Sequence, residues 1–76
     1  MEVYKRETDE IVRQFMTGRL SAIECMGALD SALDAALPGI SQEDFLEVRA
    51  IAIFNAGLVQ KEVERRGTTA RPIDFE

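Results

Sequence analysis

The chain has 76 residues, 46% of them hydrophobic, and carries a formal net charge of −5. A chain of this length buries only about 60% of the surface that its unfolded form exposes, so we expect one small domain with a modest core. It has no histidine and one cysteine, which removes the commonest general base and excludes an internal disulfide and a zinc cluster. We therefore expect a non-enzymatic, cytoplasmic protein without cofactor or metal.

No segment is typical of a targeting signal or a membrane span. Residues 1–10 hold six charged side chains, which is unlike a secretory signal. The longest nearly apolar stretch, residues 50–59, has ten residues and contains Asn55, whereas a membrane-spanning helix needs about 20 apolar residues. The sequence therefore predicts no membrane partner.

Two serines are typical of helix starts. Ser21 is followed three residues later by Glu24, which is the pattern of a capping box, and Leu20 before it can pack on Cys25. Ser41 repeats this arrangement with Asp44 in place of glutamate. These patterns predict helices that begin near residues 22 and 42.

Glycine and proline predict where the helices end. Gly18, Pro38-Gly39 and Gly67 each follow a segment with helical periodicity, as expected of helix stops. Short links make consecutive helices antiparallel neighbours. The predicted fold is an all-α, three-helix antiparallel bundle, with a helical domain over residues 1–66, an extended tail over 67–76, and helices at 2–17, 22–37 and 42–66.

The third predicted helix is apolar on several sides. At 1.5 Å per residue it is about 37 Å long, against about 22 to 24 Å for the other two, so they leave part of it uncovered. A second copy of the chain could cover it about a twofold axis. The alternative is a monomer in which the first two helices straddle the third. The predicted homodimer interface consists of Ile51, Phe54, Asn55 and Leu58.

Asn55 stands out because it lies in the apolar middle of the third helix. A buried asparagine can fix the pairing of helices across an interface at some cost in stability. It could also line a ligand cleft between helices or bond to a neighbouring loop. The sequence leaves these three roles open.

The tail alternates apolar and acidic residues after Pro72. Ile73 and Phe75 could fold back into a groove of the bundle, or the tail could bind a partner as an extended peptide. We expect it to fold back.

Charge is distributed unevenly along the chain. Residues 21–48 carry six acids and no bases. Asp30, Asp34 and Glu47 are the acids that helix starts do not explain, and they form a candidate surface for a basic partner. An acidic chain lacks the phosphate-neutralising charge of a nucleic-acid binder, so we expect no direct contact with nucleic acid.

These observations favour a non-enzymatic protein-protein interaction or regulatory module that acts as a homodimer through the third helix and has a further, unidentified protein partner. The alternative is a small acidic inhibitor that binds a basic, nucleic-acid-binding protein by charge mimicry, as phage or mobile-element proteins can. Size and style resemble short bacterial or phage open reading frames. Cys25 lies on the apolar face of the second helix, without a histidine to activate it, and is expected in the core.

Overall fold

A computed structural model describes residues 2–70 of the chain, and side-chain burial up to residue 67. It contains three helices in chain order: α1 (Glu2–Met16), α2 (Ala22–Ala36) and α3 (Gln42–Ala70). No strand occurs in this part of the chain. All three helices contact one another, which confirms the predicted all-α three-helix bundle.

Both predicted helix starts are present, and they differ in one hydrogen bond. The backbone N–H of Glu24 donates to Ser21 Oγ, and Ser21 N–H donates back to the Glu24 carboxylate at 2.9 Å. The N–H of Asp44 likewise donates to Ser41 Oγ. Asp44 accepts no bond from Ser41, because aspartate is one methylene shorter than glutamate. The second cap is therefore half of a capping box.

Two of the three glycines that were predicted to follow a helix end do so. Gly18 and Gly39 adopt φ values of 85° and 71°, the left-handed conformation that glycine reaches without steric cost. Gly67 instead lies inside α3, which continues to Ala70, so the prediction of a helix end at residue 66 is wrong. The reason is that Arg66, just before the glycine, is anchored to Glu62 and to the Phe15 carbonyl by side-chain hydrogen bonds. A helical glycine costs only about 1 kcal/mol.

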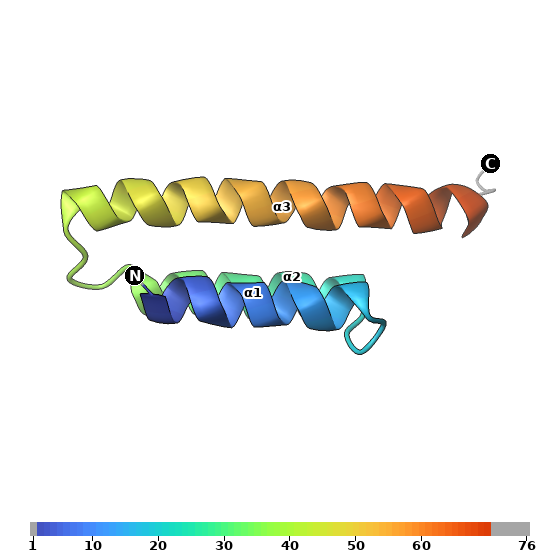
Figure 1. Cartoon of the computed structure of the whole chain (residues 1–76), viewed down its shortest axis with the longest axis horizontal. Coiled ribbons are helices and arrows are strands. Elements are labelled where there is room, and N and C mark those ends of the chain that lie inside the picture. Colours follow the sequence, from blue (N-terminus) through green and yellow to red (C-terminus); the bar gives the residue numbers. More distant parts are fainter. Residues whose placement is uncertain (1, 71–76) are drawn as a thin grey trace.

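The three helices form two layers. Figure 1 shows α1 and α2 side by side on one side of α3, whose C-terminal part extends beyond both of them. The alternative in which α1 and α2 straddle α3 is therefore not the arrangement of this chain. One side of α3, which we call the inner side, faces the α1–α2 layer, and the opposite outer side faces solvent.

The core lies between the two layers. It is built around Val12 and Phe15 of α1, Cys25 of α2 and Val59 of α3, with Leu20 packed against this cluster as the staple pattern predicts. Thr8 is also fully buried, a position that the apolar pattern of α1 did not indicate. Its hydroxyl group donates to the Tyr4 carbonyl at 2.9 Å, so burial leaves no polar atom of this side chain unpaired.

Candidate interaction surfaces

The outer side of α3 carries an apolar stripe that neither α1 nor α2 covers. It consists of Leu46, Ala50, Ile53 and Gly57, all of them exposed, and we call it the outer stripe. Leu46 and Ile53 are 55% and 61% exposed. Spacings of four, three and four residues keep these positions on one line of a helix, as in the seam of a coiled coil. Ala50 and Gly57 are small enough to let a second backbone come close.

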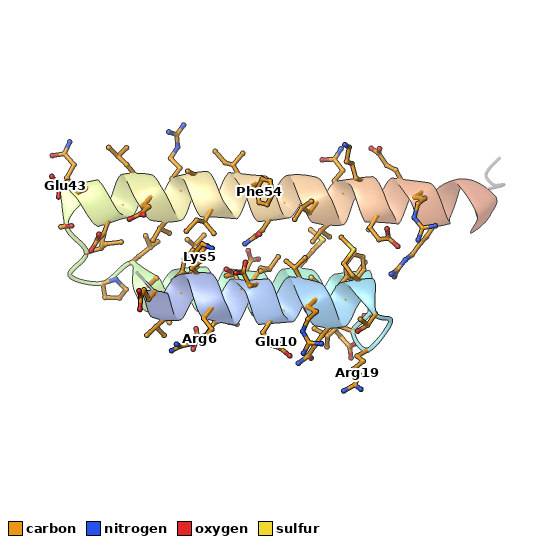
Figure 2. The ribbon with its side chains drawn as sticks, in the orientation of Figure 1. Lys5, Arg6, Glu10, Arg19, Glu43 and Phe54 are labelled. Carbon is orange, nitrogen blue, oxygen red and sulfur yellow. The ribbon has the colours of Figure 1, made fainter. Side chains whose placement is uncertain are left out.

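Beside the outer stripe runs a flank on which charge and an aromatic ring alternate. Glu47, Phe54 and Lys61 are separated by seven residues each, nearly two helical turns, so they lie in line. All three are exposed, Phe54 by 66%. Figure 2 shows Phe54 midway along α3, with its ring drawn over the ribbon and not in the space between the layers. We call this line the charged flank.

A second surface is the groove between α2 and α3. It is partly open to solvent, has a volume of about 400 Å³, and is floored in part by Tyr4 of α1. Most of its lining is apolar, and no lysine or arginine of the described residues contributes. We call it the α2–α3 groove, and its lining residues from the two helices are Met26, Leu29, Asp30, Leu33, Ala52, Asn55, Ala56, Val59, Gln60 and Val63.

Asn55 is the one described residue whose buried side-chain nitrogen lacks a hydrogen-bond partner. The side chain is 3% exposed and lines the α2–α3 groove. Leaving a buried donor unsatisfied costs about 1 to 3 kcal/mol. This cost is unusual enough in a small domain to call for an explanation.

The four residues predicted as a dimer interface occupy different places. Phe54 is exposed, whereas Ile51 and Leu58 are half-buried, and Leu58 packs against the core cluster. Asn55 lies on the inner side. Of the four predicted residues, Phe54 is therefore fully available for an interface between copies. The structure also identifies the outer stripe, which the spacing of its four residues in the sequence could have revealed. The dimer itself stays a prediction.

The three predicted partner-binding acids are exposed but are not brought together. Asp30 borders the α2–α3 groove, on the side of α3 that carries Ala56 and Gln60. Glu47 lies on the charged flank, roughly on the other side of that helix at 100° per residue. Asp34 follows Asp30 by one turn on α2. Charge mimicry therefore gains no support from their arrangement and stays a prediction.

Arg66 ties the C-terminal half of α3 to α1. Its Nη2 donates to the Phe15 carbonyl at 3.0 Å, and its guanidinium carbon lies 4.5 Å from the centroid of the Phe15 ring, within the range of a cation–π contact. Hydrogen bonds from Arg65, and then from Arg66, lower the pKa of Glu62 to about 2. The Lys61-Arg65-Arg66 segment is thus partly committed to contacts within the chain.

Cys25 is fully buried in the core cluster, as predicted. Burial raises the pKa of its thiol, which disfavours the thiolate that nucleophilic chemistry requires. Elsewhere in residues 2–70, no group of three His, Cys, Asp or Glu side chains is placed to hold a metal ion. Ile73 and Phe75, and with them the predicted folding back of the tail, lie outside the described residues.

The three helices of the described chain are each too short or too polar to cross a membrane. Comparison with known protein families, with curated proteins and with solved structures finds no match.

Proposed function

We propose that this protein is a non-enzymatic interaction or regulatory module that acts as a homodimer through α3. The observation that carries the proposal is the uncovered outer stripe. Burying one large aliphatic side chain is worth about 1.5 to 3 kcal/mol, and the stripe exposes both Leu46 and Ile53 on a helix that continues well past its two companions. A second copy offers a matching surface, because a twofold axis pairs a patch with itself.

The charged flank favours an antiparallel pair with the twofold axis at Phe54. In such a pair, a residue that precedes Phe54 in one copy lies opposite the residue that follows Phe54 by the same number of positions in the other copy. Glu47 and Lys61 are both seven residues from Phe54, so each Glu47 faces the Lys61 of the other copy. The two copies then form two such ion pairs on either side of a Phe54–Phe54 contact.

A parallel pair lacks this complementarity. In a parallel pair, the charged flank of one α3 lies beside the side of the other α3 that is across the outer stripe from its own charged flank. That side carries Arg49, Ala56 and Gln60 and offers Lys61 no acid. In the antiparallel arrangement, the α1–α2 layers lie on the far sides of the paired α3 helices. Each copy keeps the surface of α1 and α2 for a further protein partner, and its α2–α3 groove stays open.

The test is the mass of the protein in solution, measured by sedimentation equilibrium over a range of micromolar concentrations. One chain has a mass of 8.5 kDa, and the wild type is expected to approach twice this value. Ile53→Glu places a charge in the centre of the outer stripe and is expected to give the mass of a single chain.

Ile23→Glu is the matched control, because Ile23 is an exposed isoleucine of α2 and the substitution adds the same charge. It is expected to leave the mass at the dimer value. A wild type that stays at 8.5 kDa, or a control that dissociates as fully as Ile53→Glu, would refute the proposal.

A further inference from the structure

The α2–α3 groove combines a large apolar surface with one buried, unpaired donor. Asn55 lines the groove, and its buried Nδ2 has no hydrogen-bond partner among the described residues. Thr8, the other buried polar side chain in the described part of the chain, differs because its hydroxyl group is paired with the Tyr4 carbonyl. Since native proteins pair nearly all buried polar groups, the unpaired amide indicates that an acceptor reaches it from outside the described chain.

The shape of the groove suits a small molecule. Its volume of about 400 Å³ falls within the range of about 300 to 1,000 Å³ that is typical of ligand pockets. Leu29, Leu33 and Val59 provide apolar walls from both helices, and Asn55 is a polar group at depth. Apolar walls with a few well-placed polar groups are the usual design of such sites.

The charges around the groove narrow the class of ligand. Asp30 is the charged residue of its lining, and it is negative. Without a lysine or arginine among the described lining residues, an anionic ligand would meet repulsion and no compensating partner there. Asp30 is exposed, whereas Asn55 is buried, so the described lining carries no charge at the depth of Asn55, and its complement there is an uncharged apolar molecule with one hydrogen-bond acceptor.

A second copy of the chain fits the groove less well, because it is expected at the outer stripe, on the other side of α3.

We propose that the α2–α3 groove binds a small, uncharged apolar molecule whose carbonyl or ether oxygen accepts a hydrogen bond from Asn55 Nδ2. The site does not depend on the homodimer proposed above, because the lining of the groove comes from one copy.

The experiment titrates the ¹⁵N-labelled full chain with three probes of nearly equal shape and follows the spectrum by NMR. Acetophenone has an acceptor and no charge, ethylbenzene has no acceptor, and benzoate is anionic. Acetophenone is expected to move the side-chain amide signals of Asn55 downfield and to bind about threefold to tenfold more tightly than ethylbenzene, the ratio that one hydrogen bond provides. Benzoate is expected to bind most weakly.

Two matched variants locate the donor. Asn55→Leu is expected to keep ethylbenzene binding and to abolish the preference for acetophenone. Gln60→Leu removes an amide from the same lining, one that already donates to Glu64, and is expected to preserve that preference.

The proposal is overturned if the wild type binds acetophenone and ethylbenzene equally, if neither probe shifts groove signals, or if Gln60→Leu abolishes the preference as fully as Asn55→Leu. It is also overturned if Asn55→Leu changes the mass of the protein in solution, because Asn55 would then pair across an interface between copies. Loss of the dimer in Ile53→Glu with unchanged probe binding leaves the groove assignment standing.

Discussion

The two sides of α3 contain similar apolar residues but have opposite environments. On the inner side, Val48 and Val59 are buried together with Asn55, and Glu62 with Arg66 continues the line toward the C-terminal end. On the outer side, Leu46 and Ile53 are exposed. The inner side thus contains polar groups as well as apolar ones, so apolar content alone does not identify the inside of this protein. What distinguishes the inner side is its contact with the α1–α2 layer, where Arg66 donates to the Phe15 carbonyl, whereas neither α1 nor α2 covers the outer stripe.

The largest expected effect comes from replacing a buried phenylalanine by alanine and comparing it with the same substitution at an exposed phenylalanine. Phe15 is fully buried beneath α3, so Phe15→Ala should lower the free energy of unfolding by about 3 to 5 kcal/mol, the usual cost of a large core deletion. Phe54→Ala, on the exposed charged flank, should lower it by less than about 1 kcal/mol.

Both free energies are measured by urea denaturation in an Ile53→Glu background, because dimerisation would otherwise make stability depend on concentration. Equal losses from the two alanine variants would mean that Phe54 is part of the core of a single chain.

Removing the unpaired amide from the inner side should stabilise the protein. Asn55→Leu replaces a buried donor without a partner by an apolar side chain of similar size. We expect the free energy of unfolding to rise by about 1 to 3 kcal/mol in the absence of ligand. Urea denaturation measures the change, and a variant less stable than the wild type would show that Asn55 has a partner that stabilises the fold.

The charged flank provides a smaller test, on the outer side. Glu47→Lys and Lys61→Glu should each weaken the dimer about tenfold, because each leaves two like-charge pairs where exposed ion pairs of about 0.2 to 1 kcal/mol stood. The double variant restores opposite charges in the antiparallel register and should recover most of the affinity.

Sedimentation equilibrium at low salt measures these affinities, and 1 M salt should reduce the differences. A double variant weaker than either single one would exclude the antiparallel register.

The smallest effect concerns the C-terminal end of α3. Gly67 is helical, and a methyl group added there would meet no atom within 4 Å. Gly67→Ala should therefore raise the free energy of unfolding by about 0.5 to 1 kcal/mol. Gly39→Ala, at a position with a φ of 71°, should lower it. The thermal midpoint followed by circular dichroism distinguishes the two, and destabilisation by Gly67→Ala would restore a helix end at residue 66.

The sequence predicted the local parts of the fold well. Ser21 and Ser41 start their helices through hydrogen bonds to residues three positions away, and Gly18 and Gly39 end helices through their own backbone conformation. The prediction of a helix end before Gly67 is wrong because α3 is anchored by Arg66, which donates to the carbonyl of Phe15, 51 residues away in the sequence. No local pattern contains that contact.

The candidate sites were predicted less completely. Phe54 was identified, but Asn55 could be placed on the inner side only once the rotation of α3 about its axis was known. When a helix is apolar on several sides, its sequence pattern does not indicate which side is buried.

The sequence by itself determined three helices, their starts and their antiparallel order, because these depend on backbone groups satisfied within a few residues. Only the tertiary structure decided that α1 and α2 share one side of α3, that Asn55 faces a groove and that the outer stripe is exposed. Those features depend on which apolar surfaces of the three helices pack against one another. That packing is decided by contacts between helices and not by interactions within one helix.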